Sequence, residues 1–262
     1  MSKSATKTNY DVLAIGAHPD DVEVGCGGLI PKLIAQGHSA AIVILTKGEM
    51  GTGGTVEIRE KETAKAAKIL GADLIDVFDF GDTQLVDTYD RRKVIAELVR
   101  KVKPTIVLCP YPQNTNGRAQ CHPDHVATGQ ITINAVGLAR LAKFECGLPP
   151  HHVDRVFHYF LPFGLAPSFV VDITEYFDTW RSALKAHASQ FQNPDKQGDY
   201  MYYMETMARA YGQMGRCKYA QGYFAFEPLM IDDIMDLTKV KDTVIRRHAI
   251  NQEPDRSHDP GY

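Results

Sequence analysis

Two short clusters of histidine and aspartate are the part of this sequence best suited to chemistry. The first motif reads His18-Pro19-Asp20-Asp21 and the second reads His122-Pro123-Asp124-His125. Together they offer imidazole nitrogens and carboxylate oxygens, and the chain holds no C-x-x-C thiolate pair. Such donors suit Zn²⁺ in a catalytic site, where three protein ligands leave a fourth position for water. Zinc lowers the pKa of that water to about 7, and an adjacent carboxylate can accept its proton.

Each motif also has a simpler explanation as the start of a helix. Proline at the first helical position with an aspartate close by is ordinary capping chemistry. For one motif alone this explanation is as good as the functional one. Two such motifs at neighbouring strand ends favour the functional one, so the order of the elements decides between them.

The first 145 residues alternate short aliphatic runs with segments of helical periodicity. Near-continuous apolar runs, typical of parallel strands buried on both faces, are Asp11–Gly16, Ala40–Leu45, Leu74–Phe78 and Thr105–Cys109. The segments with helical periodicity are Gly28–Gln36, Val56–Leu70, Arg91–Lys101 and Asp124–Leu141. This alternation predicts an α/β fold, namely a Rossmann-like, doubly wound, mostly parallel sheet.

In a Rossmann-like sheet of order 3-2-1-4-5, the first and fourth strands are neighbours at the topological switch point, where ligands bind. The first motif follows the first strand, and the second motif follows the fourth strand. We therefore expect both motifs to face one crevice.

The second half of the chain is less regular. It contains predicted strands at Val153–Phe160 and Phe169–Asp172, helices at Glu175–Ser189 and Tyr200–Tyr211, and a last strand within Gly222–Ile231. No linker or composition break separates the halves, so we predict a single domain over residues 1–245 with an elaborated C-terminal part. Residues 246–262 are polar and predicted to be a frayed tail.

Composition excludes several classes of partner. Of 262 residues, 44% are hydrophobic and 23% charged, and the formal net charge is -3, which argues against a nucleic-acid footprint or an anionic membrane partner. No apolar run is long enough to span a bilayer, and the run from Val12 to Ala17 is too short for a signal peptide. Five cysteines without a C-x-x-C pair indicate free thiols. These features predict a cytoplasmic protein.

A dinucleotide-dependent oxidoreductase would share this fold, but its first strand should lead into G-x-G-x-x-G, whose backbone amides meet pyrophosphate. Here Gly16 leads into the first motif, whose two carboxylates would repel a phosphate. The glycine-rich Gly25-Cys26-Gly27-Gly28 comes too late after the strand to serve.

The two motifs, with Ala17 before the first and Val22-Glu23 and Gly27-Gly28 after it, resemble the LmbE/PIG-L family of zinc-dependent N-acetylglucosamine deacetylases. The similarity extends over most of the chain and is greatest to the bacillithiol-pathway branch, which deacetylates N-acetylglucosaminyl-malate. The stretches that point to this branch are Leu45-Thr46, Glu57-Ile58-Arg59, Leu148-Pro149-Pro150-His151 and Ser189-Gln190-Phe191.

The resemblance implies a role for each residue of the motifs. It makes His18, Asp21 and His125 the metal ligands and Asp20 the general base. His122 would be an imidazolium that steadies the oxyanion and protonates the leaving amine, held in its charged form by a hydrogen bond that it donates to the Asp124 carboxylate. The resemblance implies Zn²⁺ as the metal, and Fe²⁺ suits the same ligands.

Four further residues are predicted to bind the substrate. The resemblance suggests that Arg59 meets it, and its guanidinium suits the malate carboxylates; a solvated helix arginine is the alternative. Arg118 lies in a predicted loop of the kind that carries specificity. Gln120 stands where some relatives have tyrosine; it can donate a hydrogen bond but no proton, which leaves more of that task to His122. His187 precedes Ser189-Gln190-Phe191 on a predicted helix; a structural histidine is the alternative.

Two alternatives stay open. One is a deacetylase of a different N-acetylated amino sugar. The other is a non-catalytic zinc- or sugar-binding module, although a base such as Asp20 beside the ligands is unnecessary for binding alone. The expected partner is a small acetylated amino sugar, and the family analogy suggests a homo-oligomer, specifically a hexamer.

Overall fold

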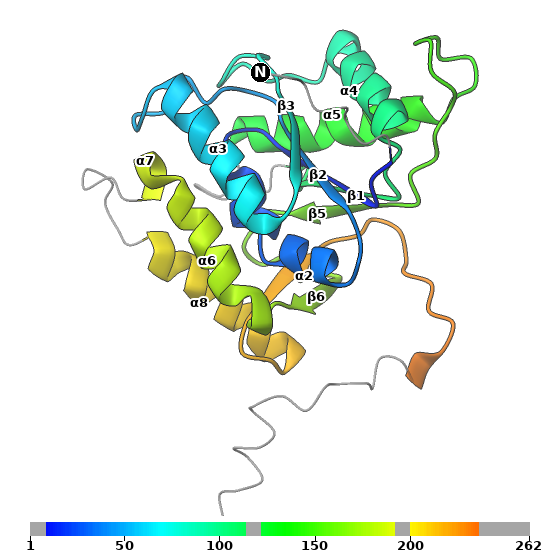
Figure 1. Cartoon of the computed structure of the whole chain (residues 1–262). Coiled ribbons are helices and arrows are strands. Elements are labelled where there is room, and N and C mark those ends of the chain that lie inside the picture. Colours follow the sequence, from blue (N-terminus) through cyan, green and yellow to red (C-terminus); the bar gives the residue numbers. More distant parts are fainter. Residues whose placement is uncertain (1–8, 114–121, 192–199, 236–262) are drawn as a thin grey trace, which may run out of the picture.

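The computed structural model describes residues 9–113, 122–191 and 200–235. Its main sheet has five parallel strands in the order β3-β2-β1-β4-β5 (Figure 1). The strands are β1 (Val12–Gly16), β2 (Ala40–Ile44), β3 (Asp73–Val77), β4 (Ile106–Pro110) and β5 (Arg155–Tyr159). The predicted Rossmann-like α/β class is confirmed, and so is the placing of β1 beside β4.

Helices cover both faces of this sheet (Figure 1). They are α1 (Asp21–Cys26), α2 (Leu29–Ala35), α3 (Val56–Leu70), α4 (Tyr89–Val102) and α5 (Pro123–Ala139). Successive side chains of β1 point to opposite faces. Ile15 packs in one buried cluster with α4 and α5, whereas Ala14 packs in a second buried cluster with α2 and α3. β1 is therefore buried on both faces, as its apolar run predicts.

Local signals set the ends of α3, which begins and ends where predicted. Thr55 caps its first turn, because the Thr55 side chain accepts a hydrogen bond from the backbone N–H of Ile58. Gly71 follows the last turn with a φ of 76°, a left-handed conformation that glycine adopts without strain. α3 therefore starts directly after the β2–α3 loop, beside the first motif.

β3 differs from its prediction in burial. The run Leu74–Phe78 predicts a strand buried on both faces, but β3 starts at Asp73 and its side chains are half-buried or exposed. The reason is position: β3 is the edge strand of the sheet, so only β2 pairs with it. The register between β2 and β3 also shifts between Ile42 and Val43.

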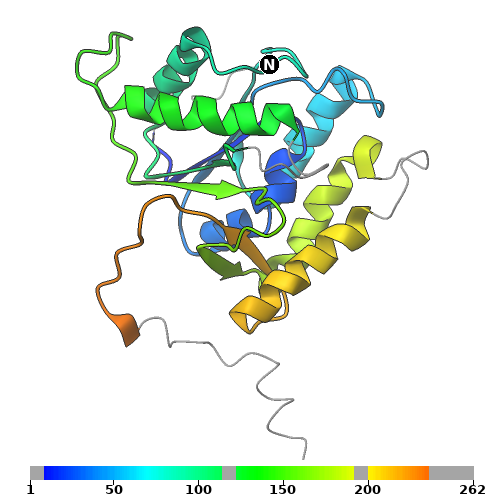
Figure 2. The same ribbon diagram turned by 180° about the vertical axis from the view of Figure 1, so that it is seen from behind.

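The C-terminal part forms a second layer beside the sheet (Figure 2). It comprises β6 (Phe169–Asp172), the 3₁₀ helix η1 (Thr174–Tyr176), α6 (Phe177–Ala186), α7 (Ala188–Phe191), α8 (Tyr200–Gly215) and β7 (Ala220–Tyr223). β6 and β7 pair antiparallel in a sheet of their own. A third apolar cluster lies under α6 and α8, with Trp180, Leu184 and Met204 among its members.

Two predictions for this part are wrong in detail. The single helix predicted over Glu175–Ser189 is divided into η1, α6 and α7. The last strand is β7, which shares only Gly222 and Tyr223 with the predicted Gly222–Ile231. Pro228 lies in the remainder of that range, and proline cannot donate to a strand ladder.

Among the described residues, no helix is both long and apolar enough to cross a bilayer. The predicted tail, residues 246–262, lies outside the described residues, and the single domain over residues 1–245 stays a prediction.

Candidate active site

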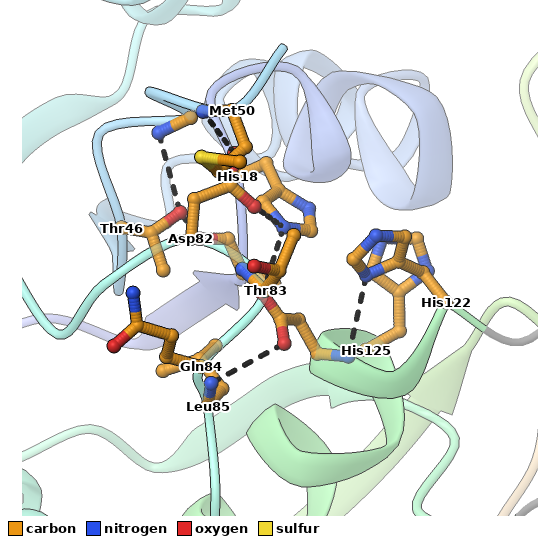
Figure 3. A network of polar contacts seen from close by, with 12 residues as sticks. His18, Thr46, Met50, Asp82, Thr83, Gln84, Leu85, His122 and His125 are labelled. Carbon is orange, nitrogen blue, oxygen red and sulfur yellow. Dashed lines mark hydrogen bonds and ion pairs between the residues drawn. The ribbon is translucent and has the colours of Figure 1, made fainter.

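The two motifs lie together at the carboxyl ends of β1 and β4, as the strand order predicts. The ring centroids of His18 and His122 are 4.7 Å apart, and those of His122 and His125 are 5.5 Å apart. Figure 3 shows the three imidazoles close together. Segments about a hundred residues apart in sequence therefore form one site.

Three predicted ligands, His18, Asp21 and His125, form a group that could hold a metal ion, with one donor atom of each within 4.8 Å of the others. Asp21 bridges the two imidazoles: its Oδ1 is 3.0 Å from Nε2 of His125, and its Oδ2 is 3.5 Å from Nδ1 of His18. A second such group combines His18 with His122 and Asp124.

Backbone donors fix the orientation of Asp21. Its Oδ2 accepts hydrogen bonds of 2.8 Å from the N–H groups of Ala17 and His18. Burial raises the pKa of the Asp21 carboxyl, but His125 and His18 outweigh burial and hold its pKa well below the usual value. Asp21 is therefore an anion whose geometry the β1–α1 turn determines.

Three carboxylates surround His18. Its Nε2 lies 3.1 Å from Oδ1 of Asp82 (Figure 3) and 3.2 Å from Oδ2 of Asp124, while Oδ2 of Asp21 lies on the side of its Nδ1. Burial lowers the pKa of His18, but hydrogen bonds to these carboxylates raise it to about 12. A buried site with this excess of negative charge fits a divalent cation, which would take the place of the imidazole proton.

The sequence prediction missed Asp82. It follows β3 in Phe80-Gly81-Asp82 and is 5% exposed, and its carboxylate accepts a hydrogen bond of 3.0 Å from the backbone N–H of Met50. An acid just beyond the carboxyl end of a strand was the available signal. β3 lies two strands away from β1, however, and only the loop after β3 brings Asp82 to His18.

Asp20 has an unusual backbone conformation, and its Oδ2 lies 4.0 Å from Nη2 of Arg59. Its φ is 116° and its ψ is -22°, a sparsely populated region for a non-glycine residue. It is the N-cap residue of α1, but its carboxylate makes no capping hydrogen bond, so capping does not explain the first motif. Burial and the neighbouring Asp21 raise the pKa of Asp20 to about 6, against the opposing charges of His187, Arg59 and His18. Its side chain lines a cavity.

Capping explains part of the second motif. His122 is the N-cap residue of α5, Pro123 is its first residue, and Nδ1 of His122 accepts a hydrogen bond of 3.3 Å from the N–H of Asp124. With Nδ1 an acceptor, Nε2 carries the hydrogen. Burial and the charges of His18 and His125 lower the pKa of His122. The ring is thus a neutral hydrogen-bond donor in this arrangement.

This geometry corrects the role expected for Asp124. Its carboxylate accepts hydrogen bonds from the N–H groups of Thr83 (2.7 Å) and Leu85 (3.3 Å) and faces His18. The predicted bond that would keep His122 charged is therefore replaced by contacts with His18 and the loop after β3. Asp124 lies in the first turn of α5 and is fully buried, which directs it inward, away from the cavity.

Arg59 and His187 do not fit their predicted contact with the substrate. Arg59 is 5% exposed and donates from Nη1 to Gly48 O (2.7 Å) and from Nη2 to Pro19 O (2.8 Å), which ties α3 to the first motif. His187 is fully buried, with Nε2 3.3 Å from Oε2 of Glu23. Burial lowers the pKa of His187, but Glu23 outweighs burial and raises it. Both side chains are buried and contact residues next to the first motif or within it.

Arg118 and Gln120 lie outside the described residues, so their substrate contacts stay predictions. The cavity itself has a volume of about 630 Å³. The two motifs contribute four side chains to its lining, from Asp20, Asp21, His122 and His125. A carboxylate with a raised pKa, an imidazole and two members of the possible metal-binding group therefore share one ligand-sized space.

Comparisons with known proteins agree with this geometry. The profile of the PIG-L family, described as GlcNAc-PI de-N-acetylase, matches residues 13–136, which include both motifs. The diacetylchitobiose deacetylase of Thermococcus kodakarensis is 37% identical over 223 residues, or 80% of this chain and 81% of that protein. A Bacillus anthracis protein named "Probable N-acetyl-alpha-D-glucosaminyl L-malate deacetylase 2" is 30% identical over 71% of this chain and 83% of its own length.

A solved structure is similar as well. The N,N'-diacetylchitobiose deacetylase of Pyrococcus horikoshii, crystallised with an inhibitor, superposes with a TM-score of 0.73 at 30% sequence identity, covering 82% of each chain. Similarity of this extent, in sequence and in fold, includes the elements that carry both motifs. This chain therefore belongs to the PIG-L family of deacetylases.

Proposed function

We propose that this protein is a metal-dependent hydrolase that removes the acetyl group from an N-acetylglucosaminyl substrate. The observation that carries the proposal is the arrangement around one cavity of a metal-binding group, a carboxylate with a raised pKa and an imidazole donor. Such a site can hold an amide and hydrolyse it. Similarity to deacetylases of N-acetylglucosamine compounds supports this chemistry.

Of the two possible groups, we propose His18, Asp21 and His125 as the ligands. Asp21 and His125 line the cavity, whereas Asp124 is fully buried and accepts hydrogen bonds from two backbone N–H groups. Nε2 of His18 faces Asp82 and Asp124, which leaves Nδ1 on the side of Asp21. The two carboxylates would then fix the tautomer of His18. The metal proposed is Zn²⁺; Fe²⁺ suits the same ligands.

A divalent cation bound there would polarise the acetamide carbonyl and lower the pKa of water. Asp20 accepts the proton of the attacking water, and the burial that raises its pKa makes it a stronger base. His122 donates a hydrogen bond from Nε2 to the oxygen that becomes negative. The proton held on Asp20 is then available to the leaving nitrogen, so the proton balance closes without a charged His122.

The decisive experiment is acetate release from N-acetylglucosaminyl compounds by the wild type and by Asp20→Asn. Asparagine tolerates the positive φ of this position, so the substitution removes the base and keeps the backbone. We expect turnover to fall by about 10²–10⁴-fold while the metal content is unchanged. Asp178→Asn, at an exposed residue of α6, is the matched control. Equal turnover of wild type and Asp20→Asn would disprove the role of Asp20; metal binding without any turnover would favour a binding module.

The group attached to the sugar is the finer question. The relatives' names give two candidate substrates: diacetylchitobiose, from the relative at 37% identity, and the malate conjugate, from relatives at 30%. The malate conjugate is also the substrate expected for the bacillithiol branch. Both belong in the assay, with N-acetylglucosamine as reference. A homo-oligomer, with six copies by family analogy, and a cytoplasmic location are proposed on the sequence alone.

A further inference from the structure

We propose that the cavity selects substrates whose aglycone, the group attached to N-acetylglucosamine, is uncharged and presents C–H surface, and that it disfavours anionic aglycones. This inference rests on the proposed deacetylase function and specifies its substrate class. The observation behind it is that the cavity walls are mostly aromatic and apolar, whereas the end formed by the two motifs holds aspartate and histidine side chains.

One face of α8 forms a large part of these walls. The lining residues of this helix recur at helical spacing and are all apolar or aromatic: Tyr200, Tyr203, Met204, Met207, Ala208 and Tyr211. The opposite face carries the ion pair of Glu205 with Arg209, joined at 2.7 Å. α8 therefore keeps its charges on the outside and turns rings and thioethers towards the cavity.

The other walls continue this surface. Phe160 stacks on the ring of His125, with centroids 4.7 Å apart, which brings an aromatic face directly to the catalytic end. Phe191 of α7 and Trp180 of α6 line the cavity as well. On β7, Gly222 has no side chain; an added Cβ would lie 2.6 Å from the Tyr211 ring, so this glycine lets the ring pack against the strand.

The charges of the cavity are confined to one end. Among the described residues that line the cavity, the aspartates and histidines are the four side chains of the two motifs. These described lining residues include no glutamate, lysine or arginine. Asp20 and Asp21 are both acidic. Among the described lining residues, an aglycone carboxylate would lose its hydration without meeting a cation beyond those at the amide end.

Aromatic faces and methionine sulfur bind C–H surface well, whether it belongs to a sugar ring, an aryl group or an alkyl chain. The volume of about 630 Å³ lies within the range of roughly 300–1,000 Å³ typical of small-molecule sites. The cavity is thus large enough for an aglycone in addition to the acetamide.

The test compares acetate release from matched glycosides of N-acetylglucosamine: the malate conjugate, the octyl glycoside, the phenyl glycoside and diacetylchitobiose, with N-acetylglucosamine as reference. We expect kcat/KM for at least one uncharged glycoside to exceed that for the malate conjugate by about tenfold or more. Which uncharged glycoside is best distinguishes a sugar from an aryl or alkyl aglycone.

Met207→Arg adds a cation to the α8 wall of the cavity, and Met214→Arg is the matched control. Both residues lie on α8, but Met207 lines the cavity whereas Met214 does not and is 64% exposed. We expect Met207→Arg to lower the preference for uncharged glycosides over the malate conjugate by about tenfold, with Met214→Arg unchanged. Met207→Ala keeps the assay interpretable if the arginine variant does not fold. We expect this substitution to raise KM for the uncharged glycoside and to leave KM for the malate conjugate unchanged.

The outcomes separate the two proposals. Equal kcat/KM for all the glycosides, or a preference for the malate conjugate in the wild type, overturns the inference while the deacetylase function stands. No acetate from any compound, with metal confirmed in the protein, overturns the deacetylase function itself.

Discussion

Asp20 and Asp21 are adjacent in the chain and yet have opposite electrostatic environments. Asp21 accepts two backbone hydrogen bonds and faces two imidazoles, which hold its pKa well below the usual value. Burial and the charge of Asp21 raise the pKa of Asp20 to about 6. Carboxylates whose environments separate their pKa values in this way commonly divide ligand and base roles between them. The positive φ of Asp20 adds backbone strain at this position.

His125→Ala tests the ligand set at the scale of one residue. Nε2 of His125 lies 3.0 Å from Asp21 Oδ1, so its removal takes one of three donors from the proposed group. We expect the metal content per chain, measured by elemental analysis, to fall substantially below that of the wild type. His38→Ala, at an exposed histidine near the amino end of β2, should retain the metal. Stoichiometric metal in His125→Ala would show that the ligand set is wrong.

At the scale of elements, Arg100 fixes the end of α5, the helix that carries the second motif. Arg100 belongs to α4 and is 2% exposed, and it donates four hydrogen bonds of 2.6–2.9 Å to backbone carbonyls. The acceptors are the carbonyl oxygens of Ala139, Leu141, Phe144 and Leu148. A guanidinium near the last carbonyls of a helix satisfies them and interacts favourably with its dipole.

Arg100→Met should therefore lower the free energy of unfolding by about 3 kcal/mol, because buried carbonyls lose their donors while an unbranched side chain still fills the space of the arginine stem. Urea unfolding measures the change, and Lys101→Met, at the exposed neighbour on α4, should leave the stability within about 0.5 kcal/mol of the wild type. Similar stability of Arg100→Met and Lys101→Met would argue against this network.

A second element-scale prediction concerns β5. His158 is 1% exposed, and its Nδ1 donates to Pro110 O at 3.2 Å, which joins β5 to β4. Burial lowers the pKa of His158 from 6.5 to about 4. Between those values the unfolded chain binds a proton that the folded chain does not, so this contribution to stability is complete above pH 6.5 and is lost as the pH falls towards 4.

His158→Asn keeps a donor near the position of Nδ1 and removes the titration. We expect its free energy of unfolding to depend less steeply on pH between 6.5 and 4 than that of the wild type, by up to about 1.4 kcal/mol per pH unit. Urea unfolding at several pH values measures both slopes. Parallel curves for the two proteins would mean that His158 has no lowered pKa.

At the scale of the whole molecule, the proposed metal would connect two parts of the chain. His18 and Asp21 follow β1, whereas His125 lies in α5 after β4. Metal bound only by the folded protein stabilises it by mass action, by about 4 kcal/mol at a thousandfold excess over Kd. Without metal, Asp21, Asp82 and Asp124 remain close together, with His18 as their counter-charge.

Dialysis against a chelator should therefore lower Tm, and added Zn²⁺ should restore it. Differential scanning calorimetry measures both shifts. His125→Ala should show little response to Zn²⁺, which separates binding at this site from general effects of the metal. A Tm that is the same with and without chelator would contradict a structural link between the two motifs.

Much of this protein was readable from its sequence. Apolar runs predicted β1, β2 and β4 to within one or two residues, because strands buried on both faces need continuous apolar sequence. Helical periodicity predicted the bounds of α3, and the local signals of Thr55 and Gly71 account for them. The strand order then predicted that the two motifs would meet, which the ring distances confirm.

Only the tertiary structure decided which side chains around the motifs are buried and which reach the cavity. Arg59 and His187 have the chemistry of substrate contacts, but packing of α3 and α6 buries both. Asp82 joins His18 through a loop, and α8 forms the cavity wall although it lies about 180 residues after the first motif. Exposure depends on contacts between distant segments, and local periodicity contains no information about those contacts.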